Sequence, residues 1–136
     1  MDTNVLVSTA IKPNGKPAQI FGQAAIRYEL ICTPYILEEL ADVLARPHIQ
    51  RKYKDLVAPA RLARFIALIE SLAAIVETQT ILDIVVDPDD NQILAGAVDG
   101  RADYLVTGDP HLLMVRQMGE CKIVTPEQFL IVLDTR

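Results

Sequence analysis

Four acidic residues could converge at one edge of the predicted sheet: Asp2, Glu39, Asp90 and Asp109. In an open α/β sheet, strand ends and helix N-termini meet at one edge, where ligands bind. Four carboxylates gathered there would repel one another, and some would stay protonated at neutral pH. A divalent cation with hard oxygen ligands, Mg²⁺ or Mn²⁺, is the simplest compensation. Such a centre activates water, orients a phosphodiester and stabilises charge on the leaving oxygen.

Asp90 has the least ordinary position of the four. The helix predicted over Pro88–Asp99 has one apolar face, formed by Ile93, Leu94, Ala97 and Val98. Asp90 precedes the first three of these by three, four and seven residues, so its side chain points toward the core. Asp87 and Asp89 are explained by capping and by the helix dipole. Because a carboxylate on the inner side of a first turn needs a partner, we favour a functional role for Asp90.

The other three acids also have ordinary explanations. Glu39 lies at the border of the apolar face of the helix predicted over residues 34–45 and can reach a cleft, whereas Glu38 points into solvent. An exposed glutamate pair is an equally good interpretation. Asp109 follows a predicted strand and, taken singly, is an N-cap. Asp2, near the beginning of the sequence, would by itself be a solvated acid.

Short apolar segments alternate with amphipathic segments along the whole sequence, a pattern typical of βαβ units and a parallel sheet. Strands are predicted over residues 28–33, 74–77, 102–107 and 121–125. Helices are predicted over residues 16–27, 34–45, 59–73, 88–99, 110–118 and 126–133. Residues 5–7 fit either a strand or the start of a helix, and residues 46–54 form a basic connector. The sequence therefore predicts an α/β fold in a single domain over residues 1–136.

The composition limits the class of protein. The 136 residues suit one domain, and 51% hydrophobic residues supply a core without disulfides. Cys32 and Cys121 lack CxxC spacing, and with only two histidines a zinc cluster has too few ligands. No basic stretch precedes an apolar run near the start, and Glu70 interrupts the most apolar segment, so neither a signal peptide nor a membrane span is predicted. We expect a soluble cytoplasmic protein.

Charge is distributed unevenly along the chain. The net charge of −5 argues mildly against nucleic-acid binding. Residues 1–68 carry nine Lys/Arg and six Asp/Glu, net +3, whereas residues 69–136 carry four and twelve, net −8. The best candidates for contacts with RNA phosphates are Arg46, Arg51, Lys52 and Lys54. A solvated connector between helices explains any one of them equally well.

Several short motifs together resemble one known family. They are Asp2-Thr3-Asn4, Thr33-Pro34 followed by Glu38-Glu39-Leu40, Asp87-Pro88-Asp89-Asp90, Ala102-Asp103-Tyr104-Leu105-Val106-Thr107-Gly108-Asp109, and Thr125-Pro126-Glu127-Gln128-Phe129. The combination spans essentially the whole chain and is similar to PIN domains, in particular to bacterial PIN proteins related to the VapC-type toxins of toxin–antitoxin systems. This resemblance implies a three-layer α/β/α sandwich with a central parallel sheet and a metal-dependent endoribonuclease.

The resemblance also implies roles for individual residues. Asp2, Asp90 and Asp109 would bind one or two Mg²⁺ or Mn²⁺ ions directly or through water, and Glu39 would ligate a metal or position the attacking water. Asn4 and Thr107 would support these ligands by hydrogen bonding. The implied partners are an RNA substrate, a cognate antitoxin and a second copy of the chain, with no membrane. The dimer surface is expected at four apolar residues: Leu62, Phe65, Ile66 and Ile69.

The sequence departs from the family at its beginning. Family members have several apolar residues before the first Asp, and these form the central strand, whereas only Met1 precedes Asp2 here. Either the start of the chain is trimmed or that strand is truncated.

Other functions fit the acids less well. A haloacid-dehalogenase phosphatase needs a second Asp where Asn4 stands, and a receiver domain needs a Lys at the end of its last strand, whereas Lys122 begins one. The Walker, GxGxxG, GxSxG and HExxH motifs are absent from the sequence. The remaining alternative is a non-catalytic PIN-fold module that binds RNA or protein, against which the full set of carboxylates argues.

Overall fold

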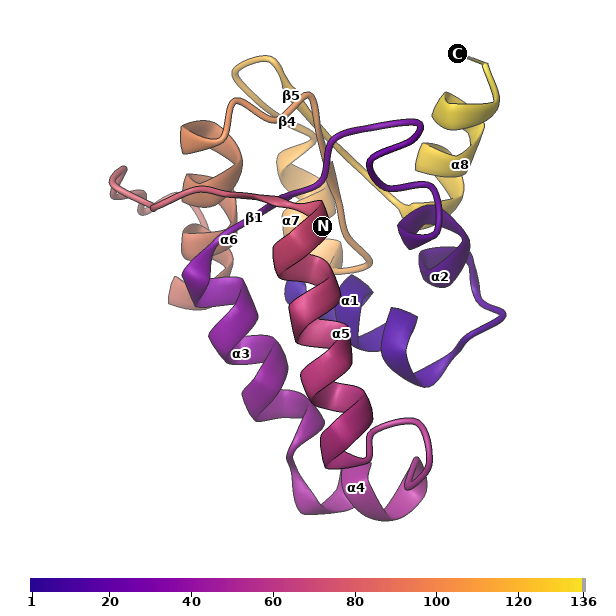
Figure 1. The fold of residues 1–136 in the computed structure, drawn as a ribbon. Coiled ribbons are helices and arrows are strands. Elements are labelled where there is room, and N and C mark those ends of the chain that lie inside the picture. The colour runs from indigo at the N-terminus through magenta and orange to yellow at the C-terminus, as the bar shows by residue number, and fades with distance from the viewer. Residues whose placement is uncertain (136) are drawn as a thin grey trace.

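The computed structural model describes residues 1–135, in which helices alternate with short strands (Figure 1). The helices are α1 (Thr3–Ile11), α2 (Lys16–Phe21), α3 (Pro34–Leu44), α4 (Pro47–Lys52), α5 (Pro59–Leu72), α6 (Pro88–Asp99), α7 (Pro110–Val115) and α8 (Pro126–Asp134). The strands are β1 (Ile31–Cys32), β2 (Ala74–Ile75), β3 (Tyr104–Val106), β4 (Gln117–Met118) and β5 (Cys121–Val124). The predicted α/β class is confirmed.

The strands form two separate sheets rather than one continuous central sheet. In the first, β1 pairs in parallel with β2, and Ile31 lies opposite Ala74. In the second, β3 pairs in parallel with β5, Leu105 lies opposite Ile123, and β4 adds an antiparallel edge to β5. No described strand lies between β1 and β3, so the two parallel pairs are not joined by hydrogen bonds within residues 1–135.

Helix N-termini follow strand ends because of proline and capping residues. Proline occupies the first turn of α3, α6, α7 and α8, where its missing N–H costs nothing. Thr33, Asp87, Asp109 and Thr125 precede these helices, and each side chain accepts a hydrogen bond from a first-turn N–H. Three of these caps follow β1, β3 and β5 closely, so helix N-termini gather at the carboxyl ends of the parallel strands.

Two helices are shorter than the sequence predicts. Helix α2 ends at Phe21 rather than at residue 27, since Gly22 follows it and Ala25 adopts a left-handed φ of 68°. Helix α7 ends at Val115 rather than at residue 118, because Arg116 has a φ of 66° and turns the chain into β4. A residue in the left-handed region cannot continue a right-handed helix. Residues 5–7 lie in α1, and the predicted basic connector contains α4.

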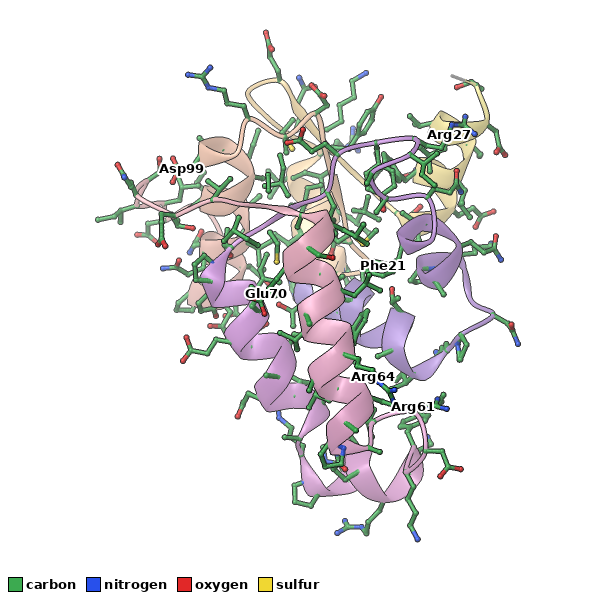
Figure 2. All side chains as sticks on the ribbon, in the orientation of Figure 1. Phe21, Arg27, Arg61, Arg64, Glu70 and Asp99 are labelled. Carbon is green, nitrogen blue, oxygen red and sulfur yellow. The ribbon has the colours of Figure 1, made fainter. Side chains whose placement is uncertain are left out.

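The main core lies between the helices and the inner faces of the strands. Its fully buried side chains include Leu6, Leu40, Leu44, Ile69 and Leu94. Helices α3 and α5 run side by side, and the Phe21 ring lies edge-on to the Phe65 ring of α5, with centroids 5.4 Å apart (Figures 1 and 2). None of the helices in the described part of the chain is long and apolar enough to cross a membrane.

The apolar face of α5 that the sequence predicts as a dimer interface packs largely against the core of the same chain. Ile69 is fully buried. Leu62, Phe65 and Ile66 are partly buried and pack against the main core. A dimer through this face would therefore add contact only to the parts of these side chains that remain exposed.

Candidate functional site

Asp2 is fixed where β3 ends and α1 begins. Its carboxylate caps α1 by accepting a hydrogen bond from the Val5 N–H at 2.9 Å. Its own N–H donates to the Val106 carbonyl at 3.1 Å. The side chain is buried, with 3% of its surface exposed. An acid that looked solvated in isolation is thus an interior group.

Thr107 joins Asp2 to Asp109. The fully buried Thr107 hydroxyl donates to the second carboxylate oxygen of Asp2 and accepts the Asp109 N–H at 3.0 Å. Asp109 in turn caps α7 by accepting the His111 N–H at 2.8 Å. Two acids separated by more than one hundred residues therefore flank one hydroxyl.

Asp90 completes a group of three acids. It lies in the first turn of α6 and is buried, with 8% exposed. Burial raises the pKa of Asp90 to about 6, with further contributions from the negative charges of Asp109, Asp87 and Asp2 and from a side-chain hydrogen bond with Asp109. We call Asp2, Asp90 and Asp109 the acidic triad.

The electrostatics of Asp2 follow the same pattern. Burial raises the pKa of the Asp2 carboxyl, and the charge of Asp109 raises it further. Hydrogen bonds from Thr107 and from the Val5 N–H oppose this effect. The acidic triad is thus a cluster of like charges in which Asp2 and Asp90 are desolvated, and the positive charge that lowers the pKa of Asp2 comes from the N-terminal amine of Met1.

Glu39 is held by a tyrosine rather than by the acidic triad. Glu39 is half-buried on α3, whereas Glu38 is exposed. The Tyr35 hydroxyl donates to Glu39 at 2.9 Å and also contacts the Asp89 carboxylate. No hydrogen bond joins Glu39 to the triad within residues 1–135. Tyr35 therefore links α3 to the first turn of α6, which carries Asp90.

A PIN-domain family model matches residues 1–111. The chain belongs to the PIN-domain family. The uncharacterized protein MJ1680 of Methanocaldococcus jannaschii is 29% identical to this PIN domain over 142 aligned residues, which cover 96% of this chain and 87% of that protein. No solved structure matches the chain significantly. PIN domains are commonly nucleases and generally bind divalent metals.

The acidic triad of this PIN domain has the right ligand atoms for a divalent cation, but its side chains are not arranged to bind one. Carboxylate oxygens are the donors that Mg²⁺ and Mn²⁺ prefer. No group of three or more His, Cys, Asp or Glu side chains within residues 1–135 is arranged to hold a metal ion. Two features explain this: Asp2 is turned to Thr107 and Val5, and Asp90 is hydrogen bonded to Asp109. A cation would have to replace the hydrogen bond between Asp90 and Asp109.

The other predicted site residues of the PIN domain lie outside the triad. Asn4 is exposed on α1 and its side chain makes no hydrogen bond within residues 1–135. The basic candidates are exposed in or beside α4, at the end of α3 opposite to Thr33 (Figure 1): Arg46, Arg51, Lys52 and Lys54. The eleven residues of α3 span about 16 Å. The basic cluster and the triad are therefore not brought together within one chain.

Sequence reasoning missed the residues that hold the segment before α6. The Asn91 amide is buried, accepts the Ile84 and Val85 N–H groups at 3.0 and 3.1 Å and donates to the Val85 carbonyl at 2.9 Å. Asp99, labelled in Figure 2, accepts the Gln79 and Thr80 N–H groups and the Thr80 hydroxyl. The position of Asp99 was one available signal. A negative charge in the last turn of a helix is unfavourable with respect to the helix dipole, which indicates that the side chain binds something else.

Proposed function

We propose that this PIN domain is a metal-dependent endoribonuclease that hydrolyses RNA phosphodiester bonds, as the toxin of a toxin–antitoxin pair. The observation that carries the proposal is the burial of Asp2 and Asp90 together with the Thr107 hydroxyl, which bonds to the Asp2 carboxylate and to the N–H of the half-buried Asp109. Desolvated carboxyls that lie close together are costly unless they serve a ligand. Perturbed carboxyls at the carboxyl end of a strand also mark a functional site.

Each residue of the site has a distinct role in this proposal. Asp2, Asp90 and Asp109 would hold one or two Mg²⁺ or Mn²⁺ ions, directly or through water. When bound, such an ion balances charge on the phosphate and makes water a better nucleophile. Thr107 keeps Asp2 oriented through its hydroxyl. Glu39, oriented by Tyr35, would position the attacking water and accept its proton.

The proposal extends to fold and partners. Arg46, Arg51, Lys52 and Lys54 would contact RNA phosphates on the side of the molecule away from the triad, so a long or folded RNA suits them better than a short one. A cognate antitoxin and a homodimer would be the protein partners, in the cytoplasm. The complete fold would be a three-layer α/β/α sandwich with one central parallel sheet.

A second candidate function is a non-catalytic module that binds RNA or protein. The observation in its favour is that no group of three ligands is arranged for a metal within residues 1–135. In such a module the hydrogen bond between Asp90 and Asp109 would be the permanent state of the site.

The experiment that separates the two functions is cleavage of a labelled, structured RNA with Mg²⁺ or Mn²⁺, with EDTA, and with Asp90→Asn. Asp55→Asn, an exposed acid outside the site, is the matched control. The nuclease predicts cleavage that EDTA abolishes and that Asp90→Asn lowers by more than the roughly 10- to 100-fold typical of residues that only support a metal ligand. Folded, metal-loaded protein that cuts none of several RNAs would favour the binding module.

A further inference from the structure

A hollow that is open to solvent lies along one side of α5. Its walls are formed by Arg61, Arg64, Phe65 and Leu68. These positions are separated by three, one and three residues, so the four side chains share one face of the helix. Both arginines are exposed, and Leu68 leaves 44% of its surface exposed. Figure 2 shows the two arginines on the first half of α5. We call these four residues the α5 hollow.

The two arginines of the α5 hollow have no negative partner within residues 1–135. The ion pairs and side-chain hydrogen bonds of this part of the chain involve other residues. Like charges three residues apart on a helix repel each other. Arg61 also stands in the first turn of α5, where a positive charge is unfavourable with respect to the helix dipole and no acid is present. Because the helix gains nothing from these charges, we expect them to serve an anionic ligand from outside the chain.

The floor of the α5 hollow is apolar and partly aromatic. Phe65 is half-buried, and the Phe21 ring lies edge-on to it with centroids 5.4 Å apart. The Phe65 ring is thus fixed by the core, while part of its surface lines the hollow. Aromatic rings and guanidinium planes are the groups on which proteins stack unpaired nucleobases. A nucleotide matches both parts of the hollow, since its base is planar and its phosphate is an anion.

The surroundings of the α5 hollow are basic. Residues 46–64 contain six Lys/Arg and one Asp. Helix α4, which carries Arg51 and Lys52, lies at the end of α5 where Arg61 stands (Figure 1). A strand of RNA that places one nucleotide in the hollow therefore finds further cations for its neighbouring phosphates.

Other occupants fit the α5 hollow less well. A twofold contact between two copies centred there would bring Arg61 and Arg64 of one copy close to the same arginines of the other, and like charges across an interface are unfavourable. An acidic peptide would pair with the arginines, but it needs a separate aromatic or apolar side chain to cover Phe65. Each nucleotide of RNA carries both groups.

We propose that the α5 hollow binds an unpaired nucleotide of RNA, with the base against Phe65 and Leu68 and the flanking phosphates on Arg61 and Arg64. This inference rests on the proposed function and names a feature of its substrate, which is RNA with a single-stranded or bulged nucleotide. A duplex keeps its bases stacked and paired, so it offers the hollow only phosphates.

The test is RNA binding by the full chain in EDTA, where a metal-dependent nuclease does not cut. The probe is a fluorescently labelled oligouridine, which has no stable secondary structure. A strand of the same length without bases and an RNA duplex serve as the comparison probes. Fluorescence anisotropy gives the dissociation constants at a series of salt concentrations.

Single substitutions of the arginines test the phosphate contacts. Arg61→Gln and Arg64→Gln each remove one cation of the α5 hollow, and Arg116→Gln is the matched control, because it removes one exposed cation outside the hollow. We expect each hollow variant to weaken oligouridine binding at least about threefold. The slope of log affinity against log salt should fall by about 0.7, the value for one contact with a single-strand phosphate. Arg116→Gln should leave the affinity and the slope unchanged.

Phe65→Leu separates stacking from charge. It removes the ring but keeps an apolar side chain for packing against Phe21, and circular dichroism checks that the variant is folded. We expect oligouridine binding to weaken about fivefold or more with an unchanged salt slope, because a stacking contact is lost. Binding of the strand without bases and of the duplex should stay the same.

Three results would overturn the proposal. The first is equal oligouridine binding by wild type, Arg61→Gln and Arg64→Gln. The second is an equal effect of Phe65→Leu on the strands with and without bases, which would make the ring purely structural. The third is tighter binding of a polyglutamate peptide that displaces oligouridine, or loss of oligouridine binding as the chain dimerises in light scattering.

The outcome is independent of the nuclease proposal. In EDTA, Asp90→Asn should bind oligouridine as wild type does. Loss of cleavage with intact binding would therefore refute only the nuclease, whereas intact cleavage with unchanged KM in Arg61→Gln and Arg64→Gln would refute only the α5 hollow as a nucleotide site.

Discussion

The Thr107 hydroxyl donates its hydrogen bond to the carboxylate of Asp2, across a separation of 105 residues. The same oxygen accepts the Asp109 N–H. This one contact sets the positions of two members of the acidic triad relative to each other. It also ties the start of α1 to the end of β3.

Replacing this hydroxyl should affect both stability and the site. We expect Thr107→Val to lower the free energy of unfolding by about 1–3 kcal/mol, because the buried Asp2 carboxylate loses a donor. Urea denaturation measures the change. Ser71→Ala removes an exposed hydroxyl that bonds within α5 and should change stability by less than about 0.5 kcal/mol. Equal losses in the two variants would contradict the role assigned to Thr107.

Without divalent metal, the triad should make the protein less stable as pH rises. The pKa of Asp90 is raised to about 6 in the folded protein from 3.8. The folded state therefore binds more protons than the unfolded state between pH 4 and 6, and the contribution of this group to stability is lost as pH rises through that range.

The comparison of wild type with Asp90→Asn isolates this contribution. With EDTA present, Asp90→Asn should gain stability relative to wild type between pH 4 and 7, by on the order of 1 kcal/mol. Urea unfolding at a series of pH values gives the difference. If the free energy of unfolding changed with pH in the same way in the two proteins, folding would not raise the pKa of Asp90.

Tyr35 should act on the reaction through Glu39. Tyr35→Phe removes the hydroxyl that donates to Glu39, so we expect kcat for RNA cleavage to fall about 3- to 10-fold with KM unchanged. The pH profile of cleavage should also shift. Tyr53→Phe is the matched control, because the Tyr53 hydroxyl makes no hydrogen bond within the described residues. A change in KM alone would indicate that Tyr35 contacts RNA instead.

Asp99 should control the order of the segment that leads into α6. Asp99→Ala removes the acceptor for the Gln79 and Thr80 N–H groups, so their hydrogen exchange should accelerate about tenfold or more. The exposed Asp103 provides a control in Asp103→Ala. Unchanged exchange at residues 79 and 80 would show that other contacts hold this segment.

The sequence predicted those features that depend on local chemistry. Helix starts were accurate because Thr33, Asp87, Asp109 and Thr125 cap helices with proline in the first turn. The inward direction of Asp90 followed from helical spacing alone, and its burial agrees with that prediction. The helix end at Val115 was missed because Arg116, a non-glycine residue in a left-handed turn, has no clear sequence signal, whereas Gly22 was an available signal for the end at Phe21.

Features that depend on distant contacts could not be predicted from the sequence. The burial of Asp2 requires Val106 and Thr107, which no local pattern near the start of the chain reveals. The two sheets are separate because no described strand pairs with both β1 and β3. Strand propensity indicates which residues form strands but not which strands pair. The distance of the basic cluster from the triad follows from the direction of α3, because a straight helix carries Arg46 away from Thr33.

The most direct test of the central claim is anomalous diffraction from crystals of the chain grown with Mn²⁺. The account predicts one or two anomalous peaks bonded to carboxylate oxygens of Asp90 and Asp109, with Asp2 bound directly or through water, and no remaining hydrogen bond between Asp90 and Asp109. Crystals that keep that hydrogen bond and show no peak at the triad, from protein that cleaves RNA under the same conditions, would contradict it.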